Sequence, residues 1–337
     1  MGAKSSFMTA MRLSTNGLVA PKCAPLLVVA YVMASAFPCD VGAQTKRLVA
    51  RADTLLAAGK VARAESLYYV ASRRSTQDPV GRAALGKYLG ARGAFKVGAV
   101  LLEEAISFGG DTAELARRRA PLLQAADDWM QLAQLARSPL TPAEKQRAEW
   151  LATHLPAVTG ADSVTVAFEP SSAQNLGRVD LVVGGVTLAA DIDPTIDELV
   201  IGDFEPYKSV VRVFSKSQRD RVAIVDSAMI GDLRLERIPA RIDHALGPAR
   251  ARIGLTLLAK LAPTVDAGAH VLTLRRTGVV NASLGRRRVP VMFQFPGIRV
   301  ARADRLVPIE SAAGRAVLNE ARWTLDIKRG ELVLEVD

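Results

Sequence analysis

Two patterns of apolar positions divide this chain. Up to about residue 155, apolar side chains recur with the period of an α-helix, and from Ser163 onward they alternate with polar ones or form β-branched runs. The fold class predicted is therefore α+β and multidomain. Helices occupy 44–155, and the C-terminal half is mainly β, with one short helix at "GLTLLAKLA" (254–262).

The helical pattern repeats after 34 residues. Gly59 and Gly93 interrupt it at equivalent places, and Leu67 matches Leu101. A period of 34 is typical of stacked helix pairs, and "ALGKYLGARG" (84–93) resembles the first helix of a tetratricopeptide repeat. A third, weaker unit is predicted over 112–136. An unrelated helical bundle is the alternative.

A further helix is predicted at the end of this region, in "SPLTPAEKQRAEWLATHLP" (138–156). Thr141 is expected as its N-cap, Pro142 as its first residue and Glu144 as the partner that completes a capping box. Pro156 marks the boundary before the β region. Within that region, Gly184 and Gly185 lie between two alternating runs and predict a hairpin turn.

The N-terminus has the features of an export signal. Basic residues precede the apolar run "APLLVVAYVMASAF" (24–37), and small residues predict cleavage after Ala43. Residues 1–43 are thus predicted to be a signal peptide and the protein periplasmic or secreted; an uncleaved membrane anchor is the alternative. No apolar window long enough to span a membrane follows residue 45.

Composition narrows the chemistry. Cys23 and Cys39 both lie in the predicted signal, so disulfides, zinc–thiolate sites and cysteine nucleophiles are not expected in the mature chain. The three histidines lack ligand spacing, and no metal or other cofactor is predicted. The net charge of +10 falls to +8 without residues 1–43. Aromatic residues make up only 5% and do not interleave with the arginine runs, which disfavours nucleic-acid binding.

The stretch "GGVTLAADIDPTIDELVI" (184–201) carries the main chemical signal. It is similar to the first half of a retropepsin-like domain, in which an apolar strand leads to the aspartate of an Asp-Thr-Gly loop. Asp193 takes the aspartate position, Ile201 lies eight residues later and Gly254 lies 61 residues later. With "RIGLTLLAKLAPTVDAGAHVLTLRR" (252–276), the resemblance covers 163–276. It implies a pepsin/retropepsin-like barrel with Asp193 as the catalytic residue.

Two substitutions affect that chemistry. Pro194 replaces the threonine and has neither hydroxyl nor N–H, and Thr195 replaces the glycine and resists positive φ. An aspartic protease needs two carboxylates that share a proton, and only one such loop is present, so catalysis would require a homodimer. Asp193 is interpreted as a catalytic aspartate, as a relic in a non-catalytic domain, or as an unrelated loop acid. A calcium loop is disfavoured because Ile196 and Gly202 stand where its template needs Gly and Glu.

A second copy of the later landmark follows at a constant offset of 60. Gly254 matches Gly314, Thr264 matches Thr324 and Asp266 matches Asp326. Residues 277–337 are therefore predicted to be a β extension that represents a truncated second lobe. No second Asp-Thr-Gly-like loop accompanies it.

Three functional hypotheses follow. The leading one is an exported binding or scaffolding protein that holds a protein or peptide partner, with a non-catalytic, aspartyl protease-like domain. The alternative is a homodimeric aspartic endopeptidase that uses Asp193. A structural envelope protein without a peptide ligand is a third hypothesis.

Overall fold

The computed structural model describes residues 41–337, apart from 75, 171–175, 204, 216–220, 279–286, 296, 320–321 and 336–337. These residues belong to one unit, Val41–Asp337. The predicted signal peptide lies outside the described residues up to residue 40, and residues 41–43 begin the first described helix.

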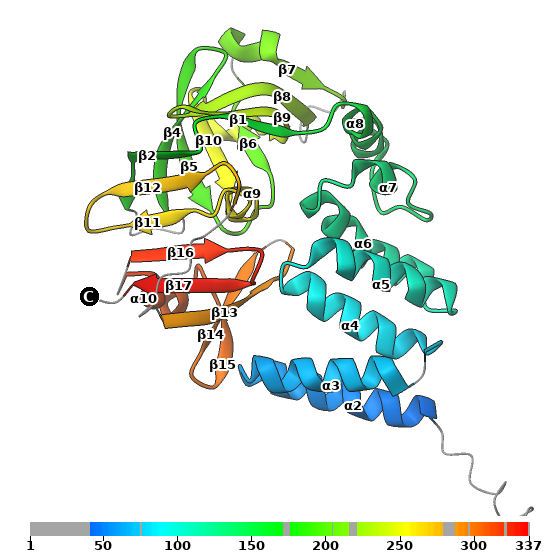
Figure 1. The fold of residues 1–337 in the computed structure, drawn as a ribbon. Helices are drawn as coiled ribbons and strands as arrows, with labels where there is room; N and C mark the ends of the chain where they lie inside the picture. The colour runs from blue at the N-terminus through cyan, green and yellow to red at the C-terminus, as the bar shows by residue number, and fades with distance from the viewer. Residues whose placement is uncertain are drawn as a thin grey trace, which may run out of the picture. The chain divides into compact units, whose positions relative to one another are not determined.

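The N-terminal part is helical and the C-terminal part is rich in β-structure, as the alternation of apolar positions predicts. Figure 1 shows the helices stacked in chain order beside the strands. The helices of this part are α2 (Val41–Ala57), α3 (Val61–Arg74), α4 (Pro79–Ala91), α5 (Phe95–Ser107), α6 (Thr112–Ala125), α7 (Trp129–Ala133) and α8 (Pro142–Thr153).

The 34-residue period is visible in the turns between paired helices. Gly59, Gly93 and Asp127 stand 34 residues apart and follow α2, α4 and α6, and all three have positive φ, at 67°, 86° and 54°. The pairs α2–α3 and α4–α5 pack against each other along their lengths. The region is therefore an array of helix pairs, whose third pair ends in the short α7.

Side chains cap several of these helices. The Asp78 carboxylate accepts a hydrogen bond from Val80 N ahead of α4. At α8 the predicted capping box is confirmed, since Glu144 N donates to Thr141 Oγ1 and Thr141 N donates to the Glu144 carboxylate. These bonds satisfy N–H groups that a helix start leaves without a partner.

The first sheet closes on itself. Its strands follow the order β9-β6-β10-β5-β4-β8, and β8 pairs with β9 to complete a ring, with β1, β3 and β7 attached. The predicted hairpin at Gly184–Gly185 is confirmed between β4 and β5. The strands are β1 (Ala157–Gly160), β3 (Glu169–Pro170), β4 (Gly177–Val183), β5 (Val186–Asp193), β6 (Leu199–Ile201), β7 (Val211–Val213), β8 (Arg221–Ile230), β9 (Leu233–Ile242) and β10 (Arg250–Gly254).

The second sheet has the order β15-β14-β13-β17-β16-β11-β12-β2. It combines strands from 163–276 and from 277–337, so it crosses the boundary predicted between these segments. The strands are β2 (Ser163–Ala167), β11 (Thr264–Asp266), β12 (Val271–Arg275), β13 (Arg287–Phe293), β14 (Ile298–Arg302), β15 (Arg305–Pro308), β16 (Arg322–Asp326) and β17 (Glu331–Glu335). The short helices are η1 (Glu205–Val210), η2 (His244–Leu246), α9 (Leu255–Ala259) and α10 (Ala312–Asn319).

The sequence echo at offset 60 corresponds to two hairpins that meet in this sheet. Strand β11 of the first pairs antiparallel with β16 of the second, and Thr264 lies opposite Thr324. Their hydroxyl oxygens are 2.8 Å apart in a buried position. Equivalent residues that face each other in this way indicate a local two-fold relation between the two copies.

The helical array rests on turns of the second sheet. A Cβ atom at Gly93 would collide with the backbone oxygen of Ile327, so only glycine fits there. Arg92 donates from Nη1 to Val291 O at 2.9 Å and to Gly330 O. Lys260, at the end of α9, binds the Asp127 carboxylate at 2.8 and 2.9 Å. The repeated turns of the helix pairs are thus the places where the two parts join.

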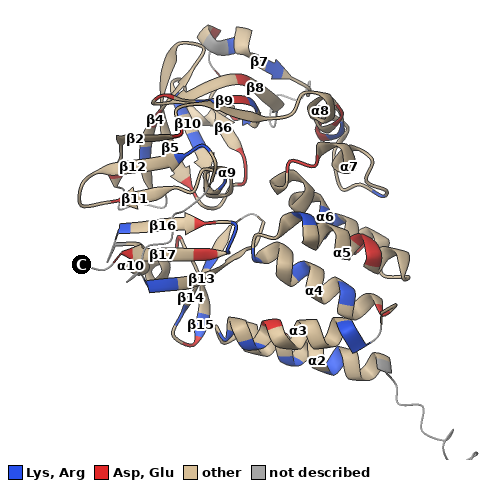
Figure 2. Cartoon of the chain, viewed as in Figure 1, with Lys and Arg blue, Asp and Glu red and all other residues tan. Residues whose placement is uncertain are grey.

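Charged residues of both signs are interspersed along the described helices and strands (Figure 2). Of these helices, none combines the length and apolar character needed to cross a lipid bilayer.

Candidate functional site

The loop between β5 and β6 lies where the sequence analysis places the chemistry. Strand β10 runs parallel to β5 and sets Gly254 beside Asp193. A Cβ atom at Gly254 would come within 2.7 Å of the Asp197 carbonyl carbon, and Gly254 N donates to Glu198 O at 3.3 Å. The two landmarks taken from the sequence therefore meet in space, and the absence of a side chain at Gly254 lets the loop pack tightly against β10.

Both carboxylate oxygens of Asp193 already have partners. Oδ1 accepts hydrogen bonds from Thr195 N at 2.9 Å and from Thr195 Oγ1 at 2.6 Å. Oδ2 lies 3.6 Å from Arg252 Nη1, which compensates its charge. Thr195 does not adopt positive φ, so the loop does not reproduce the turn that a glycine at this position would permit. Asp193 is thus tied into its own loop.

Asp191 is also fully engaged. Its oxygens bind Arg178 Nε at 2.9 Å and Arg250 Nη2 at 2.8 Å. Across the residues that the structure describes, no group of three His, Cys, Asp or Glu side chains gathers in a way that could hold a metal ion.

Glu198 ties α8 to this loop. Its carboxylate is buried and binds Arg147 Nη1 at 2.7 Å and Arg241 Nε at 2.6 Å. Arg147 also donates to Ala240 O, and Arg241 reaches Glu144 at the start of α8. A buried carboxylate between two guanidinium groups is well compensated, and this network fixes the end of the loop.

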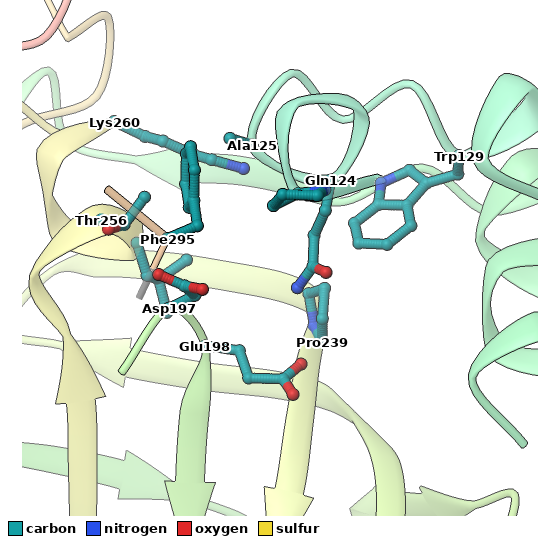
Figure 3. Close-up of a pocket in the computed structure, with 11 residues that line it drawn as sticks. Gln124, Ala125, Trp129, Asp197, Glu198, Pro239, Thr256, Lys260 and Phe295 are labelled. Carbon is teal, nitrogen blue, oxygen red and sulfur yellow. The ribbon is translucent and has the colours of Figure 1, made fainter. Parts of the chain in front are cut away.

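Asp197 lies in a small cavity of about 40 Å³ between the helical array and the closed sheet (Figure 3). Its Oδ1 is buried and has no hydrogen-bond partner in the described structure, and the same holds for Thr256 Oγ1 and Trp129 Nε1. Trp129 is 1% and Thr256 4% exposed. The remaining walls are largely apolar and come from Pro121, Ala125, Pro239, Leu257 and Phe295, with Gln124, Glu198 and Lys260 also lining the cavity.

This environment changes the acidity of Asp197. Burial, followed by the negative charge of Glu198, raises the pKa of Asp197 from 3.8 to about 6, and the neighbouring Thr256 hydroxyl opposes this rise. The Asp197 carboxyl group is therefore a poorly compensated acid that titrates close to neutral pH.

A turn from the second lobe approaches the Asp193 loop. Strands β13 and β14 form a hairpin in which Gln294 N donates to Gly297 O at 2.9 Å. A Cβ atom at Gly297 would lie 3.9 Å from Pro194 O, so this turn lies beside Pro194. The chain thus supplies its own neighbour to the loop, and the described residues of that turn carry no carboxylate.

A larger groove of about 680 Å³ opens between the helical array and the same hairpin. Its helical wall comes mainly from α2, α4 and α6, the first helices of the three pairs, and its β wall is Met292–Phe295 at the end of β13. A volume of this size is within the range of ligand-binding clefts. The groove is lined by Val49, Asp53, Leu56, Tyr68, Ala84, Lys87, Tyr88, Ala91, Leu102, Arg117, Arg118, Pro121, Leu122, Met292, Phe293, Gln294 and Phe295.

Two stacked tyrosines give this groove a fixed aromatic surface. The rings of Tyr68 and Tyr88 are 5.0 Å apart. Tyr68 Oη donates to Asp53 Oδ1 at 2.5 Å and Tyr88 Oη donates to Glu65 Oε2 at 2.9 Å. Burial, reinforced by these carboxylates, raises the pKa of both tyrosines, so the phenols stay neutral donors. Basic residues of α4 and α6 stand along one side.

Sequence reasoning found part of this arrangement. It placed Asp193 next to Gly254, but it noted Asp197 only as a departure from the Asp-Thr-Gly pattern. No motif marks Asp197 or Thr256, because their importance depends on Trp129 and Phe295, which come from distant parts of the chain. The only available signal was an acidic pair, Asp197–Glu198, directly before a fully apolar strand.

Comparisons with known proteins give a limited result. No family model and no curated protein matches the sequence. Among solved structures, a retropepsin-like aspartic protease from Rickettsia conorii matches with 14% identity and a TM-score of 0.24, over 35% of this chain and 90% of that one.

Proposed function

We propose that this protein is a non-catalytic binding protein that holds an extended peptide segment of a partner in the groove between the helical array and the β13–β14 hairpin. The groove is the observation that carries this proposal. It has apolar walls, a pair of rigid tyrosines and unpaired length along three helices, which suit apolar side chains spaced along an extended peptide.

The arrangement around Asp193 supports a non-catalytic role. Thr195 and Arg252 occupy its carboxylate oxygens, whereas a protease needs that carboxylate to share a proton with a second one. A second copy of this loop would have to approach beside Pro194, where the turn at Gly297 already lies. A homodimeric endopeptidase is therefore disfavoured on two independent grounds.

Export is part of the proposal. The predicted signal peptide would direct the protein to the periplasm or the medium, with a mature chain that begins at Gln44. In that setting the protein would act as a holder or scaffold for other exported proteins.

A substitution that fills the groove tests the proposal. Ala84 lies on the groove wall in the middle of α4, and Ala84→Trp should block the groove without breaking the helix. A phage-displayed pool of unstructured 12-residue peptides is selected on the mature wild type, and the affinity of the enriched peptides is then measured. We expect Ala84→Trp to weaken their binding at least about tenfold, which corresponds to about 1.4 kcal/mol.

Ala62→Trp is the matched control, because Ala62 is exposed on α3 and does not line the groove. It should bind the same peptides as the wild type does. Equal binding by all three proteins, or the failure of a folded wild type to enrich any peptide, would show that the groove is not a peptide site.

A further inference from the structure

The Asp197 cavity has an electrostatic property that its neighbours lack. Glu198 has two arginine partners, and Lys260 is engaged by Asp127. Asp197 Oδ1, in contrast, has no partner among the described residues, although it is buried beside the equally unpartnered Thr256 Oγ1. A buried polar atom without a partner is costly, so these two oxygens favour a ligand that donates hydrogen bonds and carries positive charge.

The shape and walls of the cavity restrict that ligand further. Phe295, Leu257 and Pro121 form apolar sides, which suit an aliphatic stem, and an aromatic ring near the charge adds cation–π attraction. An ammonium group is compact and has three donors, so it can bind both free oxygens in a cavity of about 40 Å³. A planar guanidinium is larger and matches a two-oxygen fork better than two separate oxygens.

The cavity adjoins the groove. Pro121 of α6 and Phe295 of the β13–β14 turn line both. A peptide that follows the groove toward this end therefore passes the mouth of the cavity, and one of its side chains can enter. Trp129 Nε1, a donor without a partner in the described structure, is available at the same place for an acceptor on the peptide, such as a backbone carbonyl.

We infer that the Asp197 cavity is a specificity pocket for a lysine side chain of the bound peptide, with Asp197 and Thr256 accepting hydrogen bonds from its ammonium group. This inference rests on the proposed function, because the peptide reaches the pocket from the groove. It adds a requirement that the groove alone does not impose, namely a lysine at one fixed position.

The first test uses n-butylammonium, which mimics the end of a lysine side chain and does not need the groove. Its dissociation constant is measured by ligand-observed NMR titration at pH 7.5. We expect Asp197→Asn to weaken binding about tenfold or more, as the loss of a charge-assisted hydrogen bond implies, and Thr256→Val to weaken it less. Wild-type affinity should also fall as the pH is lowered from 7.5 to 5, because Asp197 takes up a proton.

Asp180→Asn is the control for the loss of one negative charge, because Asp180 is exposed on β4 and remote from the cavity lining. It should bind n-butylammonium as the wild type does. Far-UV circular dichroism checks that each variant is folded, and Thr256→Val provides an independent variant if Asp197→Asn does not fold. Equal binding of n-butylammonium by the wild type and by the folded pocket variants would overturn the inference.

The second test uses the peptides enriched on the wild type. Each lysine is replaced in turn by norleucine, which keeps the stem and removes the ammonium. We expect one replacement to cost about tenfold in affinity for the wild type and nothing for Asp197→Asn. Peptides that bind in the groove without a lysine preference would overturn the pocket and leave the proposed function standing. If no peptide binds, the proposed function fails, and the butylammonium titration alone decides on the pocket.

Discussion

At the scale of single residues, the two aspartates of the β5–β6 loop differ in how their charges are compensated. Asp193 has hydrogen bonds from Thr195 and a nearby guanidinium, whereas Asp197 faces an apolar cavity and the charge of Glu198. The residue that resembles a catalytic aspartate is therefore neutralised within its own structure. The residue with ligand-binding character stands four positions later.

The raised pKa of Asp197 predicts how stability depends on pH. The folded protein keeps the Asp197 proton up to about pH 6, while the unfolded chain releases it near the model value of 3.8. Between these pH values the folded state binds more protons, so the contribution of Asp197 to stability falls as the pH rises through this window. The loss is at most about 3 kcal/mol by pH 7.

Asp197→Asn removes this dependence, because an amide does not titrate. We expect the variant to be more stable than the wild type at pH 7 and similar to it near pH 4, and urea denaturation at both pH values measures the difference. Asp180→Asn, on the exposed face of β4, should change neither value appreciably. A stability difference that is the same at pH 4 and pH 7 would show that Asp197 does not titrate in this range.

At the scale of elements, the turns between helix pairs do two jobs. They reverse the chain at intervals of 34 residues, and they form the contacts with the C-terminal strands. The sequence predicted the first job from the spacing of Gly59 and Gly93. It could not predict the second, because the contact partner of Gly93 is the turn at Ile327–Gly330, more than two hundred residues away.

Gly93→Ala tests this contact. The substitution places a Cβ against Ile327 O and requires positive φ, at +86°. Gly109→Ala is a matched control, because Gly109 has φ +91° and open space around the added atom. We expect Gly109→Ala to cost about 1–2 kcal/mol of folding free energy through backbone strain alone, and Gly93→Ala to cost clearly more. Equal losses in thermal or urea denaturation would mean that the turn does not bear on the second sheet.

At the scale of the whole molecule, the pairing of strands explains what the sequence could and could not predict. The change of apolar period separated helices from strands, and the offset of 60 identified two related hairpins, which face each other at Thr264 and Thr324. The second sheet, however, joins β2, near the start of the β region, to strands close to the C-terminus. Such long-range pairing leaves no local pattern, so neither the sheet nor the groove and cavity beside it could be predicted.

The central claim is that the chain binds peptides without cleaving them, and one measurement addresses it directly. The mature protein is incubated at pH 3–6 with the peptides that it enriches and with an unfolded protein, alongside Asp193→Asn, and all products are identified by intact-mass spectrometry. We predict that both proteins bind the peptides and that every peptide is recovered intact. Cleavage by the wild type that is lost in Asp193→Asn would contradict this account and establish an aspartic endopeptidase.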